Sequence, residues 1–530
     1  MFIRKMIIHN FKSLKNANIA FNPNLNIIVG DNETGKTTLL EAINLVVSNQ
    51  MNNRNINYEL SPYIFNYEVV AEYILSIKSG HPIPPPSIVI EAYLEPLAEF
   101  ARFEGSNNTL KENCPGLRLI IEFDEEFIDE YTQLLSNTEE IRTVPVEFYS
   151  VKWYSFANKL LTARSAPLSI SFIDNSTYKT NSNADRYLSK IINNVLERKQ
   201  KVDLSLLFRK LKEVFQDFDG VKKINSFLET KKGDISEKTL SVSMDVSSNS
   251  SWETNLIPHL DGIPIFYAGQ GEQSCVNIKL AMESSNDSHI FLVEEPENHL
   301  SFPNMNKLIS KIKEKGKDKQ IFITTHSSFV LNKLGINNVM LLNNGKAITL
   351  NDLSPDTKEY FMKLPGHDTL RMILSRKPIL VEGPSDELIV QKAFFDLFGI
   401  LPLEKGVDVI SVGALAFKRF LEIARLLELE IAVVTDNDGD TDRLVDKYKD
   451  FTGIKNIKLC FSPEKDYPTL EPQLLHFNSL DILNIILETK FENVEDILHF
   501  MKNNKTDCAL KVFNTKQKIT MPEYILNAIK

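Results

Sequence analysis

One segment near the start of the chain constrains its fold more than any other. An apolar run, Leu25-Asn26-Ile27-Ile28-Val29, leads into Gly30-Asp31-Asn32-Glu33-Thr34-Gly35-Lys36-Thr37, and a helical pattern follows from Thr38. A strand, a glycine-containing loop and a helix in this order bring backbone N–H groups and the positive end of the helix to one point, where phosphate oxygens bind. The segment therefore predicts an α/β domain built around a nucleotide-binding loop.

The loop residues have distinct expected roles. Glycines let the backbone face the β- and γ-phosphates, Lys36 supplies a positive charge there, and the Thr37 hydroxyl can ligate Mg²⁺. The predicted cofactor is ATP. The residues expected to bind it in this loop are Gly30, Asn32, Gly35, Lys36, Thr37 and Thr38.

A pair of acids farther along the chain supports the same prediction. The apolar run 290–293 ends in Glu294 and Glu295. Phosphoryl transfer to water needs one acid that holds the metal ion and a second that orients or deprotonates the attacking water. We therefore expect Glu294 to hold Mg²⁺ through water and Glu295 to act as the catalytic base of ATP hydrolysis.

Two weaker patterns flank this acid pair. Gly269-Gln270-Gly271-Glu272-Gln273-Ser274 precedes a helical run. A glycine-rich turn at a helix N-terminus binds anions, although a plain helix start explains the pattern equally well. Downstream, an apolar run leads to Thr324-Thr325-His326-Ser327. A lone histidine there is more often structural; within this set of motifs it is a candidate γ-phosphate sensor.

Together with the opening residues Ile7-Ile8-His9-Asn10-Phe11-Lys12-Ser13, these motifs resemble the ABC-type ATPase heads of the SMC and RecF kind. The resemblance covers roughly the first two thirds of the chain. It implies that Gly271 and Ser274 of one subunit complete the ATP site of another, with His326 also at the nucleotide. The protein is accordingly expected to form a homodimer or a higher homo-oligomer.

Two acidic clusters lie near the C-terminus, each just after an apolar run. The first is Glu382-Gly383-Pro384-Ser385-Asp386, and the second is Asp436-Asn437-Asp438-Gly439-Asp440. Carboxylates at the carboxyl ends of neighbouring strands meet in one crevice, where they repel one another unless a divalent cation neutralises them. Asp440 is open between a metal ligand and an ordinary polar turn. The residues expected to hold one or two Mg²⁺ or Mn²⁺ ions beside a phosphodiester are Glu382, Asp386, Asp436 and Asp438.

These clusters look like the two-part signature of a Toprim domain, and with Glu471 and Lys505 the order of motifs is similar to the overcoming lysogenization defect (OLD) family of nucleases. This resemblance spans essentially the whole chain. It implies that Glu471 is a further metal ligand and that Lys505 is a catalytic lysine; taken alone, they would be a loop acid and a surface lysine. It also implies a role in phage defence, either alone, beside a helicase-like protein, or beside a retron reverse transcriptase with its nucleic acid.

The motifs divide the chain into four expected segments. The fold class is α/β, an ABC-type (SMC/RecF-like) ATPase domain with a helical insertion, followed by a Toprim α/β domain. The insertion is expected because apolar residues recur at helical spacing in 187–196 and 206–211. It is either a solvated helical hairpin or an arm for dimerisation or for facing DNA. The segments are 1–155 and 241–375 for the two parts of the ATPase domain, 156–240 for the insertion, and 376–530 for the Toprim domain.

Composition narrows the class of protein further. The 530 residues are 43% hydrophobic and 25% charged, which is ordinary for a soluble globular protein. No uncharged apolar stretch reaches the length of a membrane span, and the start of the chain runs directly into a strand pattern instead of a signal peptide. The four cysteines lie far apart, so we expect neither a zinc site nor disulfides and predict a cytoplasmic location. The net charge of −10 excludes a uniformly basic DNA-coating surface but permits a basic groove.

We therefore expect an ATP-binding, metal-dependent DNA endonuclease whose ATPase head regulates the Toprim site. The alternative is a non-cutting ATP-dependent DNA-binding scaffold of repair or recombination, in which the acidic cluster is a structural ion site. A topoisomerase would need a further domain with a nucleophilic tyrosine, and a zinc-bearing primase would need a cysteine cluster. The sequence favours neither of these two.

Overall fold

The computed structural model describes most of the chain, and it divides into two compact units. One unit contains Ala166–Ile321 with the first two residues, and the other contains Ile3–Ser165 and Phe322–Lys530. No helix in the described part is long and apolar enough to cross a membrane. The described residues are 2–30, 34–52, 54–135, 141–174, 195–232, 235, 238–245, 252, 256–284, 288–298, 300–315, 318–327, 330, 334, 338–343, 346–349, 353–363, 371–373 and 375–530.

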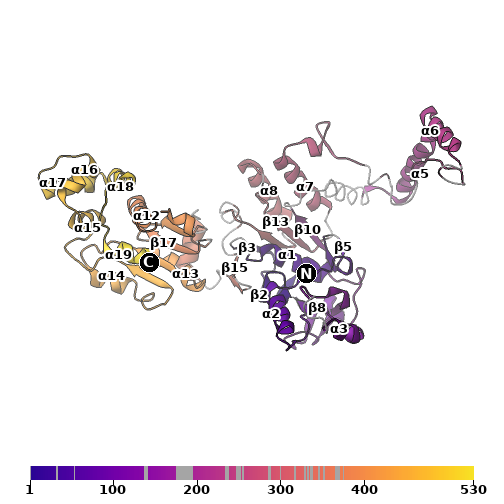
Figure 1. Ribbon diagram of the computed structural model, residues 1–530, viewed down its shortest axis with the longest axis horizontal. Helices are drawn as coiled ribbons and strands as arrows, with labels where there is room; N and C mark the ends of the chain where they lie inside the picture. Colours follow the sequence, from indigo (N-terminus) through magenta and orange to yellow (C-terminus); the bar gives the residue numbers. More distant parts are fainter. Residues whose placement is uncertain are drawn as a thin grey trace. The chain divides into compact units, whose positions relative to one another are not determined.

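The N-terminal part is built on an antiparallel sheet, whose apolar face is covered by helix α1 (Lys36–Ser48). Alternate residues of the long strand β8, such as Leu117 and Leu119, are fully buried, as a sheet with one covered face requires. The Trp153 indole N–H donates to the Val46 carbonyl of α1 at 2.9 Å and joins the two layers. Helices α2 (Tyr67–Lys78) and α3 (Ile128–Leu135) belong to the same part (Figure 1). The strand order is β2 (Leu14–Ala20), β1 (Ile3–Phe11), β6 (Ile88–Leu94), β8 (Cys114–Phe123) and β7 (Glu104–Gly105), with β9 (Tyr149–Ser155) also paired with β8.

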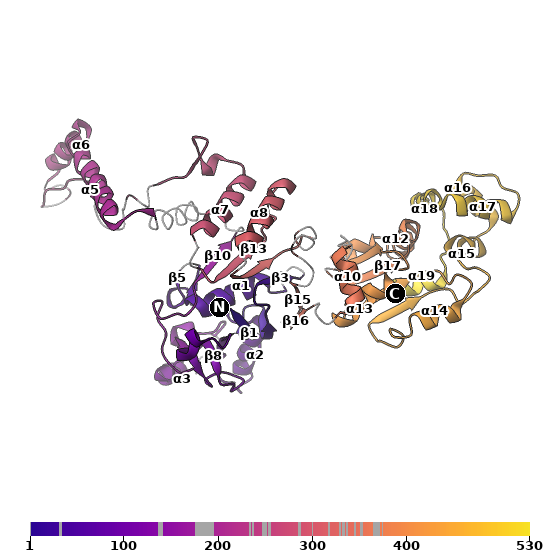
Figure 2. The same cartoon turned by 180° about the vertical axis from the view of Figure 1, so that it is seen from behind.

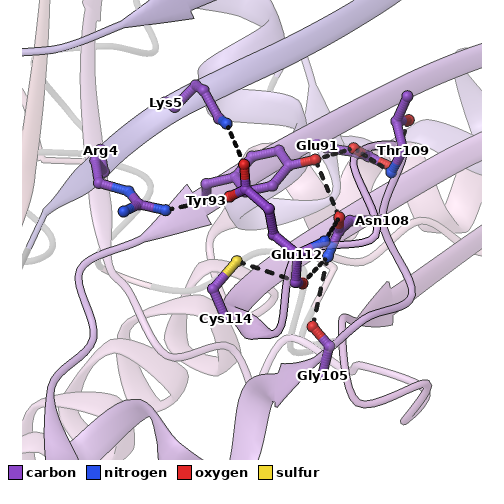
Figure 3. Close-up of polar contacts among 9 residues, drawn as sticks. All are labelled: Arg4, Lys5, Glu91, Tyr93, Gly105, Asn108, Thr109, Glu112 and Cys114. Carbon is purple, nitrogen blue, oxygen red and sulfur yellow. Dashed lines mark hydrogen bonds and ion pairs between the residues drawn. The ribbon is translucent and has the colours of Figure 1, made fainter.

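A buried carboxylate fastens the loop between β7 and β8 to this sheet (Figure 3). Glu91 of β6 is fully buried and accepts hydrogen bonds from the Thr109 N–H at 2.9 and 3.0 Å, the Thr109 hydroxyl at 3.0 Å and the Tyr93 hydroxyl at 2.9 Å. Arg118 Nε on β8 lies 3.3 Å from Glu91 Oε1. Burial, and then the bond to Glu91, raises the pKa of Tyr93, so its hydroxyl remains a donor. Both oxygens of this buried charge therefore have partners.

Replacing Glu91 with alanine is expected to destabilise the protein by about 3–5 kcal/mol, because Arg118 loses its charged partner and the Tyr93 hydroxyl and Thr109 lose their bonds to the buried carboxylate. The matched control is Glu112→Ala. Glu112 pairs with Lys5 at 3.3 Å and Arg4 at 3.5 Å, but its side chain is 43% exposed, so its loss should cost below about 1 kcal/mol. Urea midpoints followed by circular dichroism test the difference, and equal shifts in the two variants would contradict it.

The loop-bearing strand β3 (Leu25–Val29) pairs in parallel with β15 (Val339–Asn343), which pairs antiparallel with β16 (Lys346–Thr349). At the end of β14 (Gln320–Thr324), the Thr325 N–H donates to the Ile28 carbonyl of β3 at 3.2 Å. All five residues of β14 are buried. In β3, four of the five residues are buried, so the apolar run 25–29 forms a buried parallel strand, as its sequence predicts.

In the other unit, β10 (Ile170–Asp174) pairs in parallel with β13 (Ile290–Glu294). Helices α7 (Gln270–Ser284) and α8 (Phe302–Lys315) contact each other and lie side by side in both views (Figures 1 and 2). Helices α5 (Arg198–Phe215) and α6 (Asp219–Thr230) also lie next to each other (Figures 1 and 2).

Strand β10 falls inside the stretch predicted as a helical insertion, 156–240. This is a difference from the expectation, and its cause is a pairing with β13 from more than a hundred residues away, which no local pattern reveals. The described helices of that stretch are α5 and α6, while the helical pattern at 187–194 lies outside the described residues. Many apolar side chains on α5 and α6 are exposed, including Leu207 and Phe227.

The C-terminal part is built on a parallel sheet in the order β18 (Val407–Ser411), β17 (Lys377–Val381), β19 (Ile431–Val434) and β20 (Ile457–Cys460). The strands are short apolar runs, as expected for a sheet covered on both faces. Successive strands are linked through helices α12 (Pro384–Phe398), α13 (Phe417–Leu426) and α14 (Thr441–Lys447) (Figure 1). The second parallel sheet expected from the sequence is therefore present.

After Cys460 the C-terminal part continues in helices alone. Apolar residues of these later helices, such as Leu483 and Ile525, complete one core with α12. The helices are α15 (Leu470–Phe477), α16 (Leu480–Leu487), α17 (Val494–Asn503), α18 (Lys505–Asn514) and α19 (Glu523–Ile529).

The segment that precedes β17, residues 351–376, is the connector, and part of it is held on the C-terminal sheet domain. It includes helix α10 (Pro355–Lys363), where the hydroxyls of Ser354 and Thr357 both donate to the Glu422 carboxylate of α13. The rings of Phe361 and Phe420 meet with centroids 5.2 Å apart. The connector is therefore packed structure in this region.

Candidate functional site

The predicted phosphate loop begins where β3 ends and closes at the start of α1. Gly35 has a left-handed backbone with φ 98°, and a Cβ atom there would lie 2.9 Å from the Leu14 side chain, so glycine is required. Lys36 is buried, and its Nζ donates to the Gly30 carbonyl at 3.0 Å, which holds the ammonium over the loop. Thr37 is exposed, whereas Thr38 is buried with its hydroxyl 2.9 Å from that of Ser13. Asn32 lies outside the described residues.

The two predicted acids follow one another at the end of β13. Glu294 is the last residue of the strand and is buried. Glu295 has a left-handed backbone with φ 40°, an unfavourable conformation for a residue with a Cβ atom. The Asn298 amide donates to Glu295 Oε2 at 2.7 Å and fixes the carboxylate. Sequence reasoning missed Asn298, although an asparagine three residues after the acid, in a turn, is a signal that could have found it.

The remaining residues predicted to contact the nucleotide lie at the start of helix α7 and just after strand β14. Helix α7 begins at Gln270, so Gly271 is in its first turn, and Gln273 donates its side-chain amide to the carbonyls of Phe266 and Ala268. Ser274 is 1% exposed. His326 is half-buried and directly follows Thr325, whose N–H binds β3. These two segments belong to different units of the chain.

The acidic clusters lie at one edge of the C-terminal sheet, where the parallel strands β17 and β19 both end. Glu382 Oε1 accepts hydrogen bonds from the Thr435 hydroxyl and, at 3.1 Å, from the Asp436 N–H. Asp386, in the first turn of α12, accepts from the Gly383 N–H at 3.0 Å. The structure therefore brings together the first acids of both clusters, which stand more than fifty residues apart in the sequence. Thr435, which sequence reasoning passed over, is the side chain that joins them.

Glu471 and Lys505, predicted from family resemblance alone, also meet. Glu471 lies in the first turn of α15, is 4% exposed, and accepts from the Thr469 hydroxyl at 3.0 Å. Lys505 is the first residue of α18, and its Nζ lies 3.3 Å from Glu471 Oε1. Half of the Lys505 side chain remains exposed, so its ammonium can also face a bound anion.

The electrostatics show that four of these carboxylates share one environment. Burial first, and then the charges of Asp386, Glu382 and Glu471, raise the pKa of Asp436 to about 8, against a lowering by Lys505. Burial, followed by the charge of Glu382, raises the pKa of Asp386 to about 6. The neighbouring charges therefore disfavour the ionisation of Asp436 and Asp386, as expected of acids that lie close to other carboxylates.

The donor atoms fit a hard divalent cation, although the carboxylates do not surround one point. Among the described residues, no group of three or more His, Cys, Asp or Glu side chains is arranged to hold a metal ion. Glu382 and Glu471 instead bind protein donors, namely Thr435 and Thr469. Carboxylate oxygens are the preferred ligands of Mg²⁺ and Mn²⁺, and a cation would relieve the mutual repulsion. Coordination would require Glu382 and Glu471 to turn from these donors toward the ion.

The other two acids of the second cluster differ from Asp436. Asp438 has a left-handed backbone with φ 49°, and its N–H donates to the Pro468 carbonyl at 3.2 Å. Asp440 is the N-cap of α14 and accepts from the Arg443 N–H at 3.1 Å. Of the two interpretations left open for Asp440, the structure therefore shows a capping role.

The pKa of Asp436 predicts how the metal-free protein responds to pH. Its folded pKa of about 8 lies above the ordinary carboxyl value of 3.8, so folding favours the protonated form. The free energy of unfolding should therefore fall as pH rises through the window between these values. In Asp436→Asn, which stays neutral, this fall should be smaller. Melting temperatures in EDTA from about pH 5 to about pH 9 test this, and parallel curves for the two proteins would contradict it.

Two family models match the chain. An AAA domain matches residues 5–243, and the TOPRIM domain described as overcoming lysogenization defect protein-like matches residues 373–438. The second match contains Glu382, Asp386 and Asp436.

Curated relatives match only a short segment. The DNA replication and repair protein RecF of Psychromonas ingrahamii is 49% identical over 43 residues, which is 8% of this chain and 12% of the relative. RecF of Actinobacillus pleuropneumoniae serotype 5b is 34% identical over 74 residues, or 13% of this chain and 21% of the relative. The chain therefore matches about a fifth or less of these proteins.

Similar solved structures include an SMC head bound to the C-winged helix domain of ScpA, at a TM-score of 0.35 and 13% identity, covering 66% of this chain and 98% of the other. The SMC head domain from Thermotoga maritima has a TM-score of 0.30 and 14% identity, with 66% and 97% covered.

The α/β fold class and the order of the two expected domains are confirmed by the sheets and by the two matched families. The chain thus joins an AAA-type ATPase domain to a C-terminal Toprim domain of the OLD-like kind, which is the domain architecture of the OLD family.

Proposed function

We propose that the protein is an ATP-binding, divalent-metal-dependent DNA endonuclease of the OLD kind, in which the ATPase domain regulates a phosphodiesterase site on the Toprim domain. The observation that carries the proposal is the meeting of Glu382, Asp386, Asp436 and Glu471 with Lys505 at one strand edge. Phage defence is the proposed setting, because the Toprim match is to that family.

In this proposal the four carboxylates hold one or two Mg²⁺ or Mn²⁺ ions, with Asp438 as a further candidate ligand. The bound metal would supply an activated water and charge stabilisation for the leaving oxygen. We assign Lys505 the role of neutralising the phosphate or protonating the leaving group; its pairing with the buried Glu471 at 3.3 Å and its half-exposed side chain support this.

For the ATPase domain we propose that Lys36 and Thr37 bind the nucleotide phosphates and Mg²⁺, that Glu294 holds the same ion, and that Glu295 orients the attacking water. The bond from Asn298 supports the last role, since it fixes the Glu295 carboxylate. Gly271 and Ser274 of one subunit would complete the ATP site of another in a homodimer, and His326 would sense the γ-phosphate.

The test is incubation of purified protein with supercoiled plasmid and each divalent metal, with and without ATP. Nicked or linear DNA that appears only with Mg²⁺ or Mn²⁺ supports the proposal. ATP-dependent DNA binding without any cut would favour the second candidate, a non-cutting repair scaffold, for which the short RecF similarity speaks.

A further inference from the structure

Two exposed tyrosines lie on the segment between helices α1 and α2, and no motif pointed to them. Tyr63 is 84% exposed and Tyr67 is 73% exposed. The Tyr67 hydroxyl donates to Glu68 Oε1 at 3.4 Å, whereas the Tyr63 hydroxyl has no hydrogen-bond partner within the described part of the chain. Both rings are therefore open to solvent, and a flat ligand could stack on them.

Local hydrogen bonds fix the backbone of this segment. Ser61 caps the short 3₁₀ helix η2 (Pro62–Ile64), where its hydroxyl oxygen accepts from the Tyr63 N–H at 3.4 Å. Asn66 caps α2, where its side-chain oxygen accepts from two N–H groups of the first turn at 3.2 and 3.4 Å. Serine and asparagine are preferred at such positions because their side chains satisfy N–H groups that the helix leaves open. The two rings are thus presented from a backbone of defined conformation.

The same segment packs against the turn between β1 and β2, and that turn contacts the start of α1. The Lys12 N–H donates to the Ile64 carbonyl at 2.8 Å, and the Asn66 side-chain amide donates to the Lys12 carbonyl at 2.7 Å. The next residue, Ser13, has its hydroxyl 2.9 Å from that of Thr38 in the first turn of α1. One turn of chain therefore separates the segment that carries the tyrosines from the phosphate loop.

The other proposed contacts indicate on which side of the loop the base of ATP would lie. His326, the proposed γ-phosphate sensor, follows Thr325, whose N–H donates to the Ile28 carbonyl on the β14 side of β3. The base is at the opposite end of the nucleotide from the γ-phosphate. On the α1 side, the β1–β2 turn reaches the loop so closely that a Cβ atom on Gly35 would lie 2.9 Å from Ser13 Oγ. The base is therefore expected beside this turn and the tyrosine segment.

We propose that Tyr63 and Tyr67 form the base-binding wall of the ATP site, on which the purine ring stacks. The inference rests on the proposed function, because it takes the phosphates of ATP to lie in the loop. Stacking of a base on an aromatic side chain typically contributes on the order of 10-fold in affinity. Every base has a π-face, so this wall would hold adenine and guanine about equally well.

The test compares the wild-type protein with the double variant Tyr63→Ala/Tyr67→Ala by isothermal titration calorimetry in Mg²⁺. ATP and inorganic tripolyphosphate serve as separate ligands, since tripolyphosphate has the phosphates but no base. The Kd for ATP should rise on the order of 10-fold in the variant, and the Kd for tripolyphosphate should be unchanged. Tyr63→Phe/Tyr67→Phe keeps both rings and should bind ATP as the wild type does.

Tyr58 provides the matched control. It is also 84% exposed, but it lies near the far end of α1, where the Ile56 N–H donates to the carbonyl of the C-cap residue Asn49 at 3.2 Å. Tyr58→Ala should therefore leave the affinities for both ligands unchanged. Unchanged ATP affinity in the double alanine variant, or an equal loss of ATP and tripolyphosphate, would overturn the base-binding wall alone. A wild-type protein that binds neither ligand would overturn the nucleotide site itself.

Discussion

Glu382→Ala is expected to lower metal-dependent DNA cleavage by at least about 10³-fold, the range seen when a central member of a catalytic group is removed. Glu382 is the residue that connects the two acidic clusters, since one of its oxygens binds both the Thr435 hydroxyl and the Asp436 N–H. Its loss removes a proposed metal ligand and also frees the start of the second cluster. Nicking of supercoiled plasmid in Mg²⁺ and in Mn²⁺ is the measurement.

The matched control for this variant is Asp440→Ala. Asp440 belongs to the second cluster, but its carboxylate caps α14, so its loss should cost about 1 kcal/mol of stability and leave cleavage within a few-fold. Glu382→Gln keeps the shape of the side chain and should be as inactive as the alanine variant. Plasmid nicking by Glu382→Ala at the wild-type rate, after removal of contaminating nuclease, would show that the metal site lies elsewhere.

Lys36→Ala is expected to weaken ATP binding by roughly 100-fold, which corresponds to about 2.7 kcal/mol. Lys36 is buried, and the Gly30 carbonyl holds its ammonium over the loop. It is also the one basic residue in the loop sequence 30–37, so its loss removes the positive charge that the loop offers to the phosphates. Binding of a fluorescent ATP analogue in Mg²⁺ measures the loss. Plasmid cleavage by the same variant, with and without ATP, then reports whether the nucleotide promotes or restrains cutting.

A nearby lysine provides the comparison. Lys12 Nζ lies 2.5 Å from Glu41 Oε2 of α1, so its charge is already paired. Lys12→Ala should therefore change the ATP affinity by only a few-fold. Equal ATP affinity in Lys36→Ala and the wild type would mean that the phosphate loop does not bind the nucleotide.

The sequence predicts both sites because the chemistry expected of each depends on a short contiguous segment. The strand 25–29, the left-handed Gly35 and the buried Lys36 are all encoded within twelve residues, and the structure has the predicted order of strand, loop and helix. The acids after β17 and β19 could also be recognised from the sequence, because an apolar run followed by carboxylates is typical of the carboxyl edge of a parallel sheet.

The contributions of other residues could not be predicted, because they come from distant parts of the chain. Strand β10 pairs with β13 across more than a hundred residues, and it lay in a stretch expected to be helical. Thr435 donates to the predicted acid Glu382, more than fifty residues before it in the chain, but it is an ordinary polar residue until that partner is placed.

The sequence by itself therefore predicted two kinds of site and determined the order of their domains, since glycine conformation, strand burial and the clustering of like charges are local properties. Only the tertiary structure decided that Glu382, Asp386, Asp436 and Glu471 share one environment and that Asp440 caps a helix. The physical reason is that these relations depend on the register of parallel strands and on helices that return from the end of the chain, and no local pattern specifies either.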